Sequence, residues 1–226
     1  MSDDATSTKH INHVSSNVKQ NCIWIDTRET YFIKVMWKTL IDCHIDYCSQ
    51  LYLPSKTSEL QKLENLQKWY TKRIPEVRNL NYWQRLGALH MYSQQRRLER
   101  YRIIYTWKIL EGLAPNPGLE FHSHERRGRQ VKVPQLKGSQ SVRTLRDQSF
   151  QVNGPQLFNC LSLKLRNTSK VSVDEFKEKL DQFLEKIPDE PNVEGLVPTA
   201  CNQFNASPSN SIIDQVRRLT ERRPGA

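Results

Sequence analysis

The middle of the chain contains basic side chains whose spacing could bind phosphate. Residues 96–102 hold four arginines within about two helical turns, so several guanidinium groups can address neighbouring phosphates. Residues 68–146, the basic band, carry 17 Lys and Arg against 5 Glu, a net charge of +12 that exceeds the +10 of the whole chain. Aromatic residues such as Trp69 and Tyr105 lie among these cations, where they could stack on bases. The basic band therefore predicts RNA, DNA or an RNA–DNA hybrid as the partner, bound through phosphates.

The residues that we expect to contact nucleic acid all have basic side chains within this band. They are Lys72, Arg73, Arg85, Arg96, Arg97, Arg100, Arg102, Lys108, Arg126, Arg127 and Arg129. Two plainer interpretations stay open. The arginines could form a solvated face or pair with Glu99, and an aromatic stripe at helical spacing, here Trp83, Tyr101 and Trp107, is more often part of a core.

Catalytic motifs are missing from the sequence. A polymerase holds two metal ions with paired carboxylates, but the adjacent acids at 3–4, 174–175 and 189–190 lie in a polar start, a helix cap and a Pro-rich tail. Cys43, His44 and Cys48 lack a second ligand pair that would complete a zinc site, so we expect buried thiols there. We therefore predict no catalytic residues, no metal and no cofactor.

The cellular compartment can be inferred from the length of the apolar runs and from the number and spacing of the cysteines. No run approaches 18 apolar residues, and residues 1–9 lack the apolar core of a signal peptide. The five cysteines are odd in number and contain no CxxC pair, which favours a reducing compartment. We expect an intracellular protein with no membrane contact.

The spacing of apolar residues and the positions of Pro, Gly and capping residues predict a mainly α fold with a small two-stranded β element. Apolar residues recur at helical spacing over 31–41, 58–74, 83–113 and 172–187. The polar middle of 83–113 indicates a break or a solvated face, and Ser172 begins a capping box at the start of the last segment. Alternation at 130–134 and 149–152 predicts two short strands that pair. We expect a disordered start at 1–9, a helical region at 10–78, a basic helical extension with a short hairpin at 79–188, and a largely disordered tail at 189–226 with at most a turn of helix at 211–219.

Six sequence blocks, taken in order, resemble a known family. They are residues 38–55 (KTLIDCHIDYCSQLYLPS), 59–74 (ELQKLENLQKWYTKRI), 80–116 (LNYWQRL to EGLAPN), 149–167 (SFQVNGPQLFNCLSLKLRN), 173–191 (VDEFKEKLDQFLEKIPDEP) and 210–216 (NSIIDQV). This order resembles the region after the palm in reverse transcriptases of LINE-type, non-LTR retrotransposons of the Jockey and chicken-repeat kind. The resemblance runs from about His10 to Val216.

The resemblance implies a thumb-like helical bundle at 10–78 followed by a C-terminal extension, and RNA-directed DNA synthesis in the nucleus. The fingers, the palm with its aspartate pair and the endonuclease are absent, so we expect a truncated, non-catalytic fragment that retains non-specific binding of template-primer. Two alternatives stay open. The chain could be a helical protein-interaction module retained by a host, or part of an active RNA-directed DNA polymerase whose upstream exons are missing.

Overall fold

The computed structural model describes residues 29–46, 57–124, 128–135, 138–139, 149–190 and 210–221, together with a few residues between 9 and 20. The chain divides into two compact units, residues 1–98 (unit 1) and 99–226 (unit 2). The division falls inside helix α6 (Gln94–Leu110), whereas the sequence suggested residue 78. The described part is mainly helical with one two-stranded antiparallel sheet, which confirms the expected fold class. Residues 1–8 and 191–209, expected to be disordered, lie outside the described residues.

Unit 1 is built from helices on one hydrophobic core. Its elements are α2 (Thr30–Met36), the π-helical turn η1 (Trp37–Asp42), α3 (Cys43–Asp46), α4 (Thr57–Thr71), α5 (Tyr82–Leu89) and the first residues of α6. The η1 turn buries Trp37, whose ring lies 4.8 Å from that of Tyr70 on α4. The Tyr70 hydroxyl donates to the Ile33 carbonyl at 3.0 Å, so α2 and α4 are joined by ring packing and by a hydrogen bond.

The long helix expected over 83–113 is two helices. Asn81 caps α5, because its side chain accepts from the Gln84 amide while the Gln84 side chain accepts from the Asn81 amide. The helix ends at His90, which has the left-handed φ of 51°. Ser93 then begins α6, since its hydroxyl accepts from the Arg96 amide at 3.2 Å. The expected break therefore lies before the arginine-rich segment.

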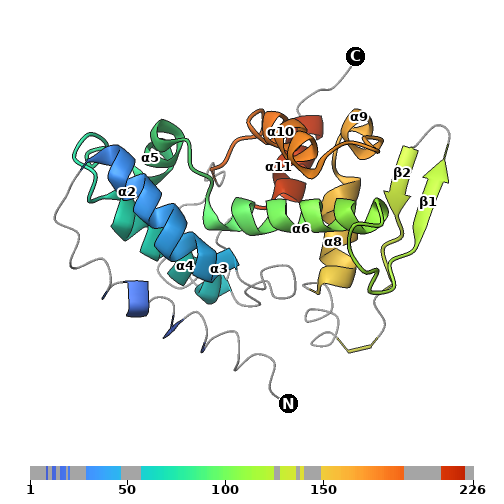
Figure 1. Ribbon diagram of the computed structural model, residues 1–226, viewed down its shortest axis with the longest axis horizontal. Helices are drawn as coiled ribbons and strands as arrows, with labels where there is room; N and C mark the ends of the chain where they lie inside the picture. The colour runs from blue at the N-terminus through green and yellow to red at the C-terminus, as the bar shows by residue number, and fades with distance from the viewer. Residues whose placement is uncertain are drawn as a thin grey trace. The chain divides into compact units, whose positions relative to one another are not determined.

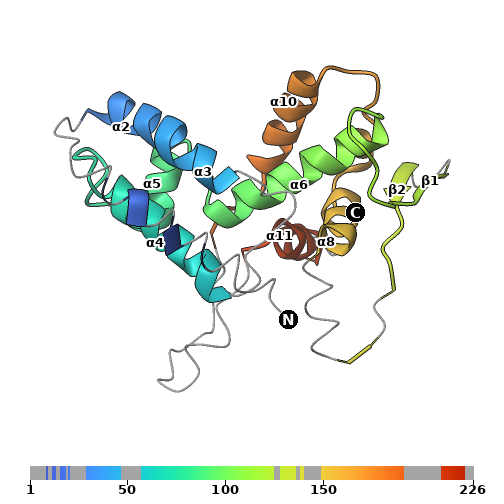
Figure 2. The same cartoon turned by 60° about the horizontal axis from the view of Figure 1, so that its bottom comes forward.

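Unit 2 packs its helices around the second half of α6. Its further elements are β1 (Phe121–His124), β2 (Gly128–Val131), α8 (Phe150–Asn159), α9 (Leu163–Arg166), α10 (Val173–Leu184) and α11 (Ile212–Glu221). In Figures 1 and 2, α8, α10 and α11 lie against this part of α6, and the β1–β2 hairpin lies beside α8 and α9. Trp107 of α6 is fully buried and stacks on Phe176 of α10, with ring centroids 4.4 Å apart.

Helix α10 forms where its sequence signal predicts it, but only the Ser172 half of the capping box is present, and the Glu175 carboxylate pairs with Lys179 instead. The Ser172 hydroxyl accepts from the Glu175 amide at 3.1 Å, and Phe176, Leu180 and Leu184 form the buried face. Helix α11 is a correction, because it spans ten residues where the sequence suggested at most a turn. Its Ile212 is buried, and the Ile212 amide donates to the buried Glu99 carboxylate at 2.7 Å.

The expected strand pairing is half right. Gln130 and Val131 lie in β2, as predicted, but β2 pairs with β1 in the register Phe121 with Val131 to His124 with Gly128. The alternating segment 149–152 is instead the start of α8. The Ser149 carbonyl accepts from the amides of Val152 and Asn153, which closes a helical turn. Alternation over four residues cannot be told from one helical turn, because both place two apolar side chains inward.

The first position of β2 requires a glycine. Gly128 has a φ of 66°, and a Cβ built there would lie 2.3 Å from Oδ1 of Asn167. That same Oδ1 accepts from the Arg129 amide at 2.9 Å, so Asn167 cannot simply move away. We expect Gly128→Ala to lower the free energy of unfolding by about 2 kcal/mol or more, from left-handed strain plus the clash.

The matched control is Gly112→Ala, measured by urea unfolding under the same conditions. Gly112 has a φ of 71° but nothing within 4 Å of its Cβ position, so it incurs backbone strain alone. A Gly128→Ala loss no larger than that of Gly112→Ala would show that Asn167 accommodates the new methyl group.

Candidate nucleic-acid interface

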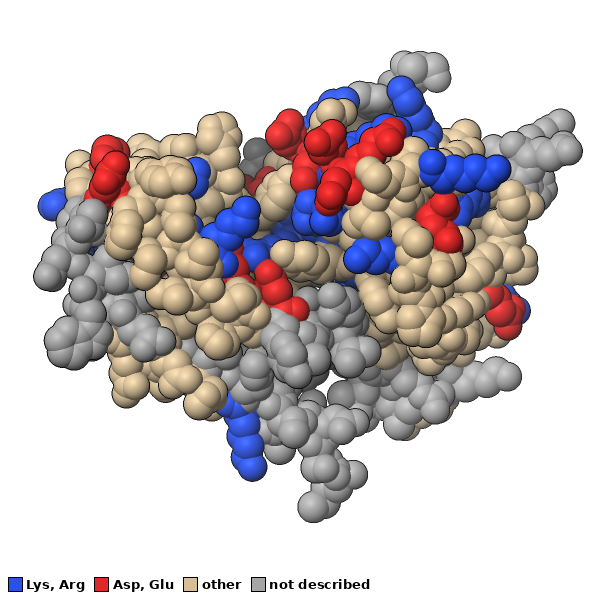
Figure 3. Space-filling model, in the orientation of Figure 1, with Lys and Arg blue, Asp and Glu red and all other residues tan. Residues whose placement is uncertain are grey.

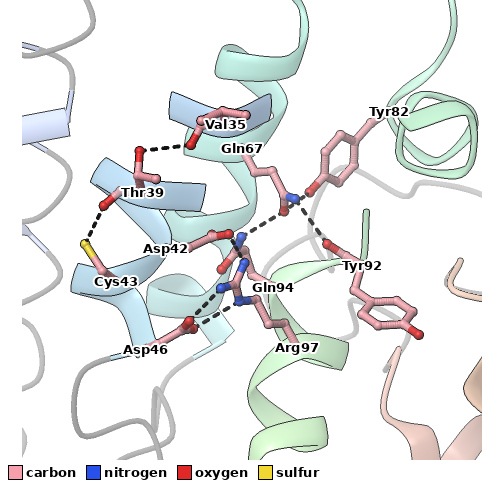
Figure 4. A network of polar contacts seen from close by, with 10 residues as sticks. All are labelled: Val35, Thr39, Asp42, Cys43, Asp46, Gln67, Tyr82, Tyr92, Gln94 and Arg97. Carbon is pink, nitrogen blue, oxygen red and sulfur yellow. Dashed lines mark hydrogen bonds and ion pairs between the residues drawn. The ribbon is translucent and has the colours of Figure 1, made fainter. Parts of the chain in front are cut away.

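Arg97 lies at the centre of a polar cluster in unit 1, drawn in Figure 4. Its guanidinium forms ion pairs with Asp42, at the end of η1, and with Asp46 of α3. The Arg97 Nε also donates to the Asp46 carboxylate at 3.0 Å. Arg97 therefore joins the start of α6 to η1 and α3, a structural role rather than one of binding phosphate.

Asp42 is only 4% exposed, so its carboxylate has lost most of its contact with water. Burial raises the pKa of Asp42 to about 6, outweighing the opposing attraction of Arg97, while Asp46 adds to the rise. Because the folded-state pKa exceeds the ordinary value, the folded protein binds this proton more tightly than the unfolded chain does. Ionising Asp42 therefore costs stability as the pH rises from about 4 through 6.

Asp42→Asn removes this titration. The free energy of unfolding of the variant minus that of the wild type should increase from pH 4.5 to pH 7.5, by at most about 3 kcal/mol for a two-unit pKa shift. Taking the difference cancels the other titrating groups, and urea unfolding at four pH values measures it. A difference that is flat with pH would mean that Asp42 ionises as an exposed acid does.

A second polar network joins α4, α5 and the start of α6 in unit 1. The Tyr82 hydroxyl donates to the Glu64 carboxylate and lies 3.0 Å from Oε1 of Gln67. The Gln94 side chain also donates to Gln67, and the other Glu64 oxygen accepts from the Gln95 amide at 3.1 Å. Glu64 thus places a negative charge at the N-terminus of α6, where the helix dipole favours one. Figure 4 shows Gln67 between Tyr82, Tyr92 and Gln94.

The arginines of α6 that the sequence assigned to phosphate are enclosed or paired. Arg96 is 1% exposed and Arg102 is not exposed at all, so expecting them to contact phosphate was wrong. Burial lowers the pKa of Arg102 to about 10, which leaves it cationic at neutral pH, and it donates to the Asn153 side chain at 3.1 Å. In unit 2 Arg100 binds both oxygens of Asp181 on α10, at 2.5 and 2.7 Å.

Two further arginines that were expected to contact phosphate instead bind groups of the protein itself. Arg85 is buried and donates to the Leu80 carbonyl at 2.7 Å and to the Thr71 hydroxyl at 3.3 Å. Arg129 pairs with Glu111 at 2.7 Å and donates to the Thr168 carbonyl at 3.1 Å. Lys108 is half-buried, and Arg126 and Arg127 lie outside the described residues. Over unit 2 in Figure 3, carboxylates lie beside many of the cations.

The remaining expected residues lie together at the C-terminal end of α4. Lys72 is exposed and Arg73 is half-buried, and exposed Lys68 lies one helical turn before Lys72. Trp69 is 40% exposed, and the Arg73 guanidinium lies 5.4 Å from its ring centroid. We call Lys68, Trp69, Lys72 and Arg73 the α4 basic surface.

Sequence reasoning missed part of this surface. Lys68 lies in the basic band but was not among the residues expected to contact nucleic acid. Of the aromatic stripe, Trp107 is in the core as expected, while Trp83 and Tyr101 are half-buried. The helical spacing of Leu63, Leu66 and Tyr70 could have indicated that Trp69 faces away from the core.

Potential metal ligands do not gather in the part of the chain that the structure describes. Within these ranges, no three His, Cys, Asp or Glu side chains converge on one point. Cys43 is exposed, contrary to the expected buried thiol, and its Sγ donates to the Thr39 carbonyl. Cys48 lies outside the described residues. Among the helices that the structure describes, none has both the length and the apolar content to cross a bilayer.

Comparison with known proteins gives no family for the chain, since no family model, curated protein or solved structure matches it. The resemblance to LINE-type reverse transcriptases therefore rests on the sequence blocks alone.

Proposed function

We propose that this chain binds nucleic acid without sequence preference through the α4 basic surface, as the non-catalytic part of a LINE-type reverse transcriptase that follows the palm. The observation that carries the proposal is the clustering of Lys68, Lys72 and Arg73 around an exposed tryptophan. The resemblance supports it from the sequence side, because α4 falls in the block that resembles the polymerase thumb.

Charge at this surface supports the same function. Residues 68–78 hold four Lys and Arg against one acid, Glu76. The Glu76 carboxylate accepts from the Thr30 hydroxyl at 2.5 Å. A local excess of cations on one helix end attracts phosphate and releases condensed counterions when it binds.

Salt dependence tests the proposal. We expect the wild type to bind a duplex or hybrid, and Lys68→Ala/Lys72→Ala to flatten the log–log salt slope by up to about two units, roughly 0.9 for each phosphate that is no longer neutralised. Fluorescence anisotropy at five salt concentrations measures the slope. The matched control is Lys177→Ala/Lys179→Ala, which removes two cations from α10, the half-buried Lys177 and the exposed Lys179. Equal slopes for both double variants would contradict binding at α4.

Catalysis is not part of the proposal. With primer, template, nucleotides and Mg²⁺, the purified chain should incorporate no more label than buffer does, because the sequence offers no credible carboxylate pair for two metal ions. Incorporation that survives further purification, and that co-elutes with the chain, would support the alternative of an active polymerase.

A protein-interaction module is the second candidate, and exposed apolar side chains on α2 and η1 favour it. Tyr31 is 75% exposed, and Phe32, Val35 and Leu40 are each more than one third exposed. The same salt titration separates the two candidates. A wild type that fails to bind nucleic acid at low salt would leave these exposed apolar side chains as the better-supported interaction site.

A further inference from the structure

We infer that the α4 basic surface binds unpaired nucleotides, with a base stacked on Trp69 and phosphates near Lys68 and Lys72. This inference rests on the proposed function and specifies its ligand. Duplex DNA already stacks its bases on one another, so an exposed indole face adds affinity only where a base is unpaired.

The exposure of Trp69 is the first argument. Trp37 and Trp107 are almost fully buried, as large aromatic side chains generally are, yet Trp69 keeps 40% of its surface in solvent. It lies beside Tyr70, whose side chain is in the core, so the helix turns Trp69 outward while its neighbour packs.

The arrangement of cations around the indole is the second argument. The Arg73 guanidinium, 5.4 Å from the ring centroid, limits the freedom of the indole by a cation–π contact. Lys68 and Lys72 are exposed one turn apart on the same helix, next to Trp69 and Arg73. With Arg73 over one face of the ring, a base would stack on the other face. An aromatic ring beside cations is the combination that single-strand binding surfaces use, because the ring stacks on bases while the cations neutralise the backbone.

The experiment compares two labelled strands of equal length and charge, one with normal bases and one with abasic residues at its centre. The wild type should bind the normal strand more tightly. Trp69→Ala should weaken binding to the normal strand by about fivefold to a hundredfold and bring it to the affinity of the abasic strand. The salt slope should stay unchanged, because the substitution removes no charge. Trp69→Phe should keep part of the affinity.

Phe121→Ala, which removes another exposed aromatic ring, is the matched control and should change neither affinity. If the wild type binds neither strand but binds a duplex of the same length, base stacking is overturned and the proposed function stands; if it binds none of the three, the proposed function itself fails. If it binds both strands equally with a normal salt slope, the function stands and base stacking is overturned. Equal weakening of both strands by Trp69→Ala also overturns stacking. The wild-type comparison needs no variant, so the test remains decisive if Trp69→Ala does not fold.

Discussion

Arg97→Ala should lower the free energy of unfolding by about 3–5 kcal/mol at pH 7.5, the range observed when one partner of a buried ion pair is removed. The substitution leaves the Asp42 carboxylate buried beside Asp46 with its main cation gone. It also removes the interactions that tie α6 to η1 and α3. Urea unfolding followed by circular dichroism measures the loss.

The loss should be smaller at pH 5. Burial already raises the pKa of Asp42 to about 6, and removing the attraction of Arg97 raises it further, so the variant relieves the buried charge by taking up a proton. Lys177→Ala serves as the control, because its pair with Asp174 lies at the surface and should contribute far less than a buried pair does. A loss below about 1 kcal/mol for Arg97→Ala would mean that this cluster is solvated.

Trp107→Ala should have a comparable effect in unit 2, about 3–5 kcal/mol, which is typical when a buried aromatic side chain is truncated. The indole stacks on Phe176, and its Nε1 donates to the Thr168 carbonyl at 2.9 Å. The variant therefore leaves a cavity and also removes a hydrogen bond to the Thr168 carbonyl, which also accepts from Arg129.

Trp107→Phe separates the two contributions. Phenylalanine keeps a ring against Phe176 but cannot donate to Thr168, so we expect it to lose clearly less stability than the alanine variant. Equal losses for the two variants in urea unfolding would contradict the assignment of most of the effect to packing.

The fold could be predicted where short-range signals decide it. The Ser172 cap and the apolar spacing of residues 176–184 together specify α10, and the same spacing specifies α4. The signal failed at 149–152, where alternation suggested a strand and the Ser149 carbonyl instead begins α8. The choice there is made by packing, because Phe150 and Val152 are buried in the helix and Asn159 of the same helix holds both backbone groups of Val131.

The candidate site could be predicted only in part, because charge in the sequence does not reveal its partner. Arg97 binds Asp46, 51 positions away, and Arg100 binds Asp181, 81 positions away. No short window of sequence contains both members of such a pair. The basic band therefore looked uncompensated, although acids far along the chain pair with several of its arginines. Lys72 is exposed and Arg73 is half-buried just after the end of α4, and contact of either with nucleic acid stays a prediction.

The net charge of +12 in the basic band consequently overstates the positive surface of the folded chain. Arg85, Arg96 and Arg102 are buried, and Arg97 and Arg100 are neutralised by aspartates. Long-range attraction of a polyanion depends on cations that face solvent, so the exposed lysines should contribute most of the attraction of this band for nucleic acid. Substituting arginines of α6 should therefore lower stability first and should leave the salt slope of any folded variant unchanged.

Lysine footprinting tests the location of the interface most directly. The wild-type chain is briefly acetylated with and without bound nucleic acid, and the modification of each lysine is measured by mass spectrometry. Lys68 and Lys72 should be protected, while Lys177 and Lys179 on α10 should react at the same rate in both samples. Protection of the α10 lysines with unchanged reactivity at Lys68 and Lys72 would contradict the α4 basic surface as the nucleic-acid interface.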